Sequence, residues 1–171
     1  MTCRPAMLSI VVTAVIAMTV TMRPNAKPHL IWNASKSIPI GLYHVQPVDR
    51  LTPASLVVAY PPEPLATYLA DGCYLPHGVP LIKRVLALTG QIVCRNGRII
   101  TVDGTESGTA RVYDHRGRSL AEWQGCHIIA AGEIFLMNPE EPASLDGRYF
   151  GPIPRSAVIG RAEPLWTFQK E

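Results

Sequence analysis

The sequence has little charge. Asp, Glu, Lys and Arg make up only 17% of its 171 residues, below the roughly 25% that is usual for soluble domains. This shortage suggests that part of the chain does not lie in water. The net charge is only +3, and there is no run of Lys or Arg and no basic stripe interleaved with aromatic residues. The composition therefore argues against a nucleic-acid-binding protein.

The sequence also lacks the spacing of a metal site. Its five histidines are scattered, and none is paired with Cys or a carboxylate at ligand spacing. They are His29, His44, His77, His115 and His127. We therefore expect no metal and no cofactor.

One long segment, residues 5–22, contains no charged residue. As a helix it would span about 27 Å, roughly the thickness of a bilayer core. A cleaved secretory signal would need an Ala-x-Ala-like site, and Ala14 and Ala17 have the wrong spacing for one. A retained anchor fits better. We assign residues 1–24 to an N-terminal membrane anchor or signal segment and 25–34 to a linker.

The remaining chain, 35–171, predicts a mainly β domain. Its many prolines and glycines favour short strands and turns over long helices. Asn96-Gly97 is a strong hairpin signal, and Asp103-Gly104 marks a further turn. The segment 81–88 could be a buried strand or a short helix. The other expected elements are strands over 56–60, 91–94, 98–102, 110–113, 119–123, 128–131, 133–137 and 157–162, with one or two helical turns over 63–70.

Candidate chemistry lies in two places. Ser35 and Ser37 precede Pro39, where serines commonly form turns, but a serine hydroxyl also becomes a nucleophile when a base takes its proton. Lys83 lies within an apolar run. On an alternating surface strand it would point to solvent. In an apolar cleft, desolvation would lower its pKa and make its amine a general base.

Three blocks resemble the type I signal peptidase family, in the family's order and downstream of an apolar N-terminal segment. They are Ser35-Lys36-Ser37-Ile38-Pro39, then Lys83-Arg84-Val85 before Leu88-Thr89-Gly90, then Asn138 with Ser144-Leu145-Asp146-Gly147-Arg148-Tyr149-Phe150-Gly151. The form of residues 33–43 in so short a chain is most similar to the TraF-type peptidases of conjugative transfer systems, which mature a pilin subunit. The likeness covers residues 33–161. It implies a signal-peptidase-like β-barrel or sheet domain with a small accessory β subdomain near 91–127.

The resemblance implies roles for individual residues. Ser37 matches the nucleophile and Lys83 the general base, the serine–lysine variant of triad chemistry. The backbone N–H of Ser37 and the hydroxyl of Ser35 match the donors of the oxyanion hole. The supporting residues are Ser144, which orients the lysine amine, and the charge pair Asp146 and Arg148.

The sequence departs from the family pattern at three points. Thr89 replaces a proline, Met137-Asn138-Pro139-Glu140 replaces Gly-Asp-Asn-Arg, and Gly147 replaces the commoner serine. These departures argue against a general secretory peptidase and for a specialised one.

Three of the four cysteines follow the anchor and would lie in an oxidising periplasm, where disulfides persist. Cys94 ends one predicted strand and Cys126 begins another, so we expect these two to pair and Cys73 to stay free. The alternative is three buried thiols.

We therefore expect a serine endopeptidase anchored in the bacterial inner membrane, with its catalytic domain in the periplasm, that cuts a pilin-like precursor after a small residue. Its partners would be that precursor, inner-membrane lipid and components of a conjugation or type IV secretion apparatus. Two alternatives remain: a non-enzymatic periplasmic assembly factor, and a LexA-like serine–lysine autoprotease.

Overall fold

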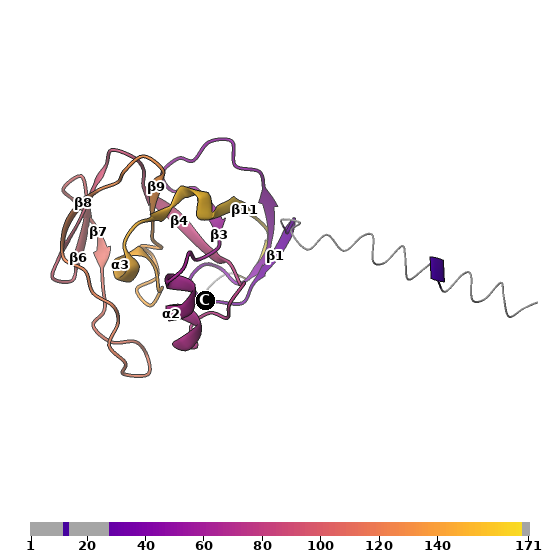
Figure 1. Cartoon of the computed structure of the whole chain (residues 1–171), viewed down its shortest axis with the longest axis horizontal. Coiled ribbons are helices and arrows are strands. Elements are labelled where there is room, and N and C mark those ends of the chain that lie inside the picture. The colour runs from indigo at the N-terminus through magenta and orange to yellow at the C-terminus, as the bar shows by residue number, and fades with distance from the viewer. Residues whose placement is uncertain (1–11, 14–27, 169–171) are drawn as a thin grey trace, which may run out of the picture.

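The structure is a computed structural model that describes residues 12–13 and 28–168 (Figure 1). The predicted anchor, 1–24, thus lies almost entirely outside the described residues. In the described part of the chain, no helix is both long and apolar enough to cross a membrane.

Seven strands form a large, entirely antiparallel sheet in the order β1-β2-β11-β3-β4-β9-β10. Their bounds are β1 Leu30–Asn33, β2 Gly41–Gln46, β3 Leu56–Ala59, β4 Leu81–Ala87, β9 Glu133–Leu136, β10 Ile153–Pro154 and β11 Val158–Thr167. Three short helices connect them: α2 Leu65–Asp71, α3 Gly147–Phe150 and the 3₁₀ turn η1 Arg155–Ala157.

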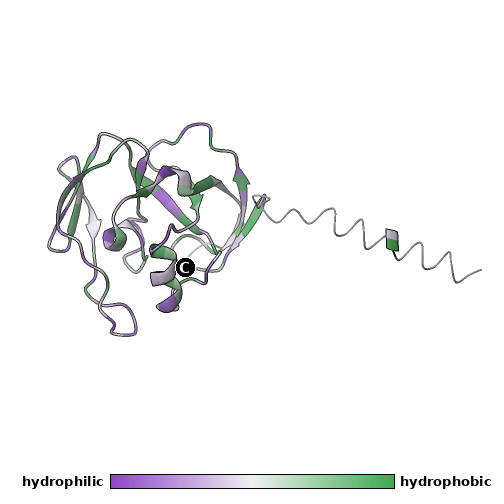
Figure 2. Ribbon diagram, viewed as in Figure 1, coloured by the Kyte–Doolittle hydropathy of each residue, from purple (hydrophilic) through white to green (hydrophobic). Residues whose placement is uncertain are grey.

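The central strands of this sheet are buried on both faces. On β3, Val57 belongs to one apolar cluster and Val58 to another, because successive side chains point to opposite faces of a strand. Lys83 and Val85 share one face of β4, and Val85 is fully buried. This two-sided burial explains why 81–88 forms a strand without polar alternation. Figure 2 shows the hydrophilic residues that interrupt the otherwise hydrophobic β4.

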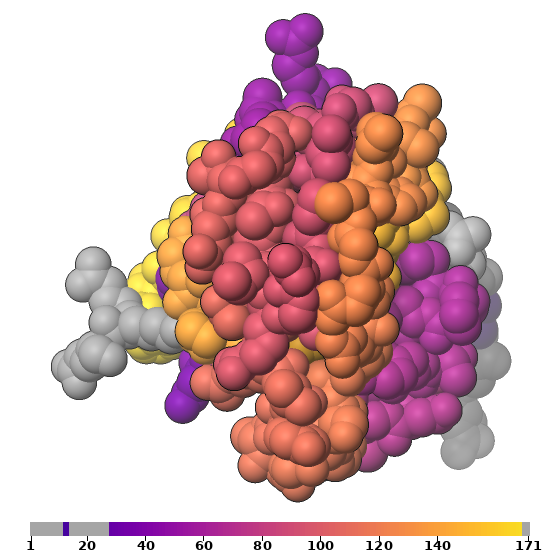
Figure 3. All heavy atoms as spheres, turned by 90° about the vertical axis from the view of Figure 1, so that its left-hand side faces the viewer, coloured from indigo at the N-terminus to yellow at the C-terminus, as the bar shows by residue number. Residues whose placement is uncertain are grey.

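A second, four-stranded sheet forms the predicted accessory subdomain, in the order β7-β6-β5-β8. Its strands are β5 Ile92–Asn96, β6 Ile99–Val102, β7 Thr105–Thr109 and β8 Gly125–Ile128. Figure 1 shows this sheet at the side of the molecule opposite β1, and Figure 3 views the molecule from that side. A disulfide joins Cys94 to Cys126, which lie opposite each other on β5 and β8. This disulfide is the pairing expected from the sequence, and Cys73 is free and exposed.

The structure corrects the expected strands over 110–113 and 119–123. Neither range forms a strand, and only a single bridge joins Tyr113 to Ser119. The reason is Asp114, whose carboxylate accepts backbone N–H groups from Arg116 and Arg118. Such local bonds favour a turn over a ladder.

Other elements differ from the expectation in extent. β1 forms inside the range 25–34 predicted as a linker, because it pairs with β2 along its whole length. The exposed positions of β1 are the apolar residues Leu30 and Trp32, so its sequence lacks the alternation of polar and apolar residues that would reveal a strand. β7 was not expected, since its sequence is short and polar. β8 ends at Ile128, where the predicted strand 128–131 was to begin.

Candidate functional site

The side chain of Asn33, at the end of β1, organises the turn that carries the two serines. Its Oδ1 accepts hydrogen bonds from Ser35 N (3.1 Å) and Ser35 Oγ (2.9 Å). Its Nδ2 donates to the carbonyls of Ile38 (3.2 Å) and Pro39 (3.1 Å). Ser37 Oγ lies 2.9 Å from Ser35 Oγ. Because the Ser35 hydroxyl proton is used on Asn33, Ser37 is the donor in this serine pair.

A second asparagine, Asn138, connects this turn to β4. Asn138 Nδ2 donates to the carbonyl of Ser37 (2.9 Å), and Asn138 Oδ1 accepts from Arg84 N (3.0 Å). Arg84 is the neighbour of Lys83 in the chain. One side chain therefore sets the position of the serine turn relative to the strand that carries the lysine.

Lys83 points into the protein, with only 4% of its surface exposed. Its Nζ donates a hydrogen bond to Ser144 Oγ at 2.8 Å. Burial lowers the pKa of Lys83 from 10.5 to about 8, opposed by the negative charges of Asp146 and Glu141 and assisted by the positive charge of Arg148. A measurable fraction of the amine is therefore neutral near neutral pH, as a general base requires.

Asp146 and Arg148 form a buried ion pair behind Lys83. Arg148 Nε and Nη2 each donate to the Asp146 carboxylate at 2.8 Å. Arg148 Nη2 also donates to the carbonyls of Glu141 (2.7 Å) and Ser144 (3.3 Å). A buried ion pair of this kind adds little net stability, but its geometry is specific. Here it holds the loop that presents Ser144 to the lysine.

Close packing explains why residue 147 is a glycine. A Cβ at this position would lie 2.7 Å from the carbonyl oxygen of Leu136 and 2.8 Å from the Phe135 ring. The serine that the family commonly has at this position does not fit this backbone without movement. The departure noted in the sequence thus follows from close packing of α3 against β9.

Ser35, Ser37, Lys83 and Ser144 all line one cavity of about 580 Å³. Among the described residues, the hydrogen bonds do not join Ser37 Oγ directly to Lys83 Nζ: Ser37 is bonded to Ser35 and Lys83 to Ser144. Asp146 and Arg148 do not line the cavity. They act on it by holding the loop that carries Ser144. The structure thus brings the predicted catalytic and supporting residues to one region.

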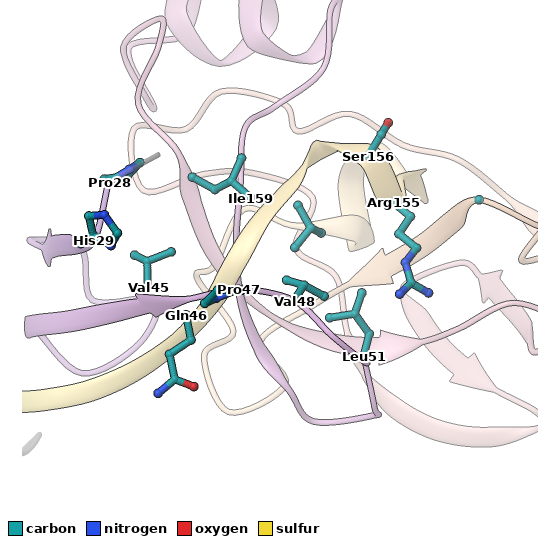
Figure 4. A pocket seen from close by; sticks show the side chains of 12 residues that line it. Pro28, His29, Val45, Gln46, Pro47, Val48, Leu51, Arg155, Ser156 and Ile159 are labelled. Carbon is teal, nitrogen blue, oxygen red and sulfur yellow. The ribbon is translucent and has the colours of Figure 1, made fainter. Parts of the chain in front are cut away.

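A larger cleft of about 800 Å³ lies elsewhere on the large sheet (Figure 4). In Figure 4 Val45, Leu51 and Arg155 are among the side chains around it. Within the described chain, its lining includes none of the predicted site residues. We therefore locate the candidate site in the smaller cavity.

Three residues of the site were not assigned a role from the sequence. Asn33 and Asn138 hold the serine turn, and Glu141 lines the cavity and raises the pKa of Lys83. Asn33 had a signal, since an Asn two residues before a Ser commonly bonds the backbone ahead of it in an Asx-turn. Asn138 and Glu141 act across contacts distant in sequence, which no local pattern reveals.

Comparison with known proteins gives consistent relatives. The chain is 37% identical to the conjugal transfer protein TraF of Agrobacterium fabrum, over 80% of this chain and 81% of that protein. It is 35% identical to a probable conjugal transfer protein TraF of Sinorhizobium fredii, over 80% and 76% of the two chains. A plasmid transfer protein TraF of Escherichia coli is 33% identical, over 80% and 82%.

Among solved structures, a signal peptidase I from Enterococcus faecalis is similar at 15% identity and a TM-score of 0.41, over 67% of this chain and 97% of that one. The family described as signal peptidase, peptidase S26, matches residues 3–166. With nearly the whole chain matched and TraF relatives above 30% identity over most of their length, this protein belongs to the peptidase S26 family of signal peptidases.

Proposed function

We propose that this protein is a serine endopeptidase in which Ser37 is the nucleophile and Lys83 the general base. One observation carries the proposal: a buried lysine amine with a lowered pKa lines the same cavity as a serine in the family's nucleophile position. A neutral amine that donates to Ser144 keeps its lone pair available for the Ser37 proton. Apo geometry is often looser than the reacting geometry, so the Ser37–Lys83 contact would form when substrate binds.

The reaction would begin with a change of hydrogen bonds in the serine turn. The Ser37 hydroxyl would turn from Ser35 Oγ to Lys83 Nζ. The Ser35 hydroxyl would turn from Asn33 Oδ1 toward the substrate oxygen. Asn33 Oδ1 would keep its bond from Ser35 N, so its carbonyl group would not be left unsatisfied.

Ser37 Oγ would then attack the scissile carbonyl carbon as its proton passes to Lys83 Nζ. The resulting oxyanion would accept hydrogen bonds from Ser37 N–H and the Ser35 hydroxyl. When the C–N bond breaks, the Lys83 ammonium would return that proton to the leaving amine, which leaves an acyl ester on Ser37. Lys83 would next take a proton from the incoming water as the water oxygen attacks the ester carbonyl, and would return that proton to Ser37 Oγ when the ester C–O bond breaks.

Other observations support a proposal for the substrate class. Relatives are named for conjugal and plasmid transfer, so we propose that the substrate is a conjugative pilin precursor cut after a small residue. Capture of the acyl-enzyme by an amine of the pilin, instead of water, would join the ends of the pilin. The substrate would bind as an extended strand beside the serine turn. Transfer apparatus components are the further partners in this proposal.

The position at the membrane is supported by an exposed aromatic cluster. Trp32 on β1 contacts Trp166 at the end of β11, with ring centroids 6.1 Å apart, and both contact Phe168. All three are exposed, and amphipathic aromatic rings favour the membrane–water interface. The Cys94–Cys126 disulfide is consistent with an oxidising compartment. We therefore propose an inner-membrane location with the domain in the periplasm.

The test is co-expression of the full chain with a candidate pilin precursor, followed by intact-mass measurement of the pilin. Wild type should remove the leader, and Ser37→Ala and Lys83→Ala should each leave the precursor uncut while accumulating to the wild-type level. Ser107→Ala, which alters an exposed hydroxyl on the accessory sheet, serves as the matched control.

One observation favours a non-enzymatic assembly factor instead: Ser37 and Lys83 are not directly hydrogen-bonded. That function predicts normal precursor maturation and normal plasmid transfer in both alanine variants. Pilin mass and conjugation frequency, measured in the same cultures, distinguish the peptidase from the assembly factor.

A further inference from the structure

The loop 111–120 forms one side of the cavity that contains the candidate site. Arg111, Asp114, His115 and Leu120 line the cavity from this loop. The facing side comes from α2 and the segment that follows it, a stretch about 40 residues earlier in the chain. Figures 1 and 3 both show the 111–120 loop beside α2.

Three side chains join these two segments, and we call them the clasp: Tyr74, Asp114 and Arg118. Tyr74 Oη donates to Asp114 Oδ2 at 2.8 Å, and Arg118 Nε donates to the same oxygen at 2.7 Å. Arg118 Nη1 reaches across to the carbonyl of Gly72 at 2.7 Å. The Arg118 guanidinium also lies over the Tyr74 ring, 4.3 Å from its centroid.

The clasp is built around a carboxylate that solvent scarcely reaches. The Asp114 side chain is only 5% exposed. Burial by itself would raise its pKa, but hydrogen bonds from Arg118, Tyr74 and Arg116 hold the pKa well below the usual value. Asp114 therefore stays ionised over the working pH range. A charged, multiply bonded contact of this kind fixes the loop in one position.

The two segments that the clasp joins also bring apolar side chains to the cavity. They are Leu69, Leu75, Val79 and Leu120, together with Tyr74. Val79 is exposed, so this surface is open to a ligand. The whole cavity of about 580 Å³ falls in the size range of ligand pockets. It is much larger than one small side chain next to a scissile bond requires.

We propose that the clasp holds the 111–120 loop as the wall of a separate apolar subsite, which selects a bulky apolar side chain of the precursor at a position other than the small residue that is cut. This inference rests on the proposed function, since it names a further specificity determinant for that peptide substrate. Arg118 does not line the cavity. It acts on the substrate only by positioning the loop.

Binding to the full-length Ser37→Ala protein in detergent tests the subsite without requiring turnover. Fluorescently labelled peptides that span the cleavage site would carry either Leu or Ala at each position in turn, and anisotropy would give their Kd values. We expect one position at which Leu binds about tenfold more tightly than Ala, as is typical of an apolar pocket. The Arg118→Ala change should bring that ratio close to one, with little effect on the Ala peptide.

Matched variants separate positioning from simple loss of folding. Arg116→Ala, in the same loop, keeps the backbone N–H that bonds Asp114 and should leave the ratio unchanged. Arg118→Lys should restore part of the preference. Val79→Trp, which fills the subsite from an exposed position, should weaken the Leu peptide and spare the Ala peptide. In the active protein, which keeps Ser37, the Arg118→Ala change should raise KM for the Leu substrate and leave kcat nearly unchanged.

Two results would overturn the subsite: no position that favours Leu in the parent protein, or a full preference that survives Arg118→Ala. Failure of the proposed function looks different. In that case the wild-type protein would not cut any peptide, whereas the Ser37→Ala protein would still bind the Leu peptide selectively.

Discussion

Lys83 Nζ donates a hydrogen bond to Ser144 Oγ at 2.8 Å, although 61 residues separate them in the chain. This contact joins β4 to the loop before α3 and fixes the direction of the amine. A lysine side chain has four rotatable bonds, and an amine aimed by a partner loses less entropy on reaching the transition state. The four predictions below follow from this contact and from the turn that faces it.

Replacing Ser144 by Ala should lower kcat without a comparable change in KM. The Lys83 amine would lose the acceptor that Ser144 Oγ provides inside a buried site, which typically costs about 1–3 kcal/mol, equivalent to roughly five- to 150-fold in rate. Steady-state kinetics on a peptide or pilin substrate would measure the loss. Ser144→Thr keeps a hydroxyl and should retain most activity. Equal kcat for wild type and Ser144→Ala would show that Ser144 does not orient the base.

The pH profile of kcat/KM should rise through an apparent pKa of about 8. Lys83 must be neutral to accept a proton, and burial lowers its pKa from 10.5 to about 8; activity is therefore low in acid and increases as the amine deprotonates. Glu141 raises this pKa, so Glu141→Gln should move the limb to lower pH. Glu106→Gln, on the accessory strand β7, is the control and should leave it in place. A flat profile down to pH 6 would exclude lysine as the base.

Lys83→Met should inactivate the protein and yet stabilise it near neutral pH. A depressed pKa means that the folded state binds fewer protons than the unfolded chain between about 8 and 10.5, so the destabilisation by Lys83 is complete below about 8 and disappears as pH rises toward 10.5. The shift is equivalent to about 3 kcal/mol. After allowance for the unpaired Ser144 hydroxyl, we expect a gain of about 1–3 kcal/mol in the free energy of unfolding at pH 7, measured by denaturant titration.

The pH dependence of that gain provides its own control. The advantage of Lys83→Met over wild type should be smaller at pH 10 than at pH 7. Lys36→Met, at an exposed position in the serine turn, should change stability little at either pH. If the Lys83→Met protein were less stable than wild type at pH 7, burial of the Lys83 amine would not destabilise the fold.

Asn33→Ala should reduce kcat by disordering the serine turn, because it removes the acceptor of Ser35 and the donor to the Ile38 and Pro39 carbonyls. Each lost bond typically costs about 0.5–1.5 kcal/mol, so we expect a loss of about tenfold or more in kcat/KM. Asn33→Asp keeps the acceptor but loses the donor and should fall between the two. Wild-type kinetics for Asn33→Ala, with unchanged folding, would mean that the turn forms without its side chain.

Much of the fold follows from local patterns. The apolar run 56–60 predicts β3, Asn96-Gly97 predicts the β5–β6 hairpin because both turn positions favour such residues, and the segment after Pro64 forms α2 as expected. Two of the failures have a common cause. The ranges 110–113 and 119–123 look like strands, but the Asp114 carboxylate bonds the backbone within its own loop.

The sequence by itself determined which residues carry the candidate chemistry, because Ser37, Lys83 and the Ser144–Gly151 block occur in a family-specific order. It also determined that the domain is mainly β, through the density of prolines, glycines and short apolar runs. It left open whether 81–88 is a helix or a strand, and whether Lys83 faces water.

Only the tertiary structure decided those questions. Lys83 is buried because β4 lies inside the sheet between β3 and β9, and its pKa falls because that burial removes water from the amine. Asn138 holds a turn 101 residues before it, and the clasp joins segments about 40 residues apart. Such effects depend on which distant segments pack together, and a one-dimensional pattern specifies neither the neighbours of a side chain nor its access to water.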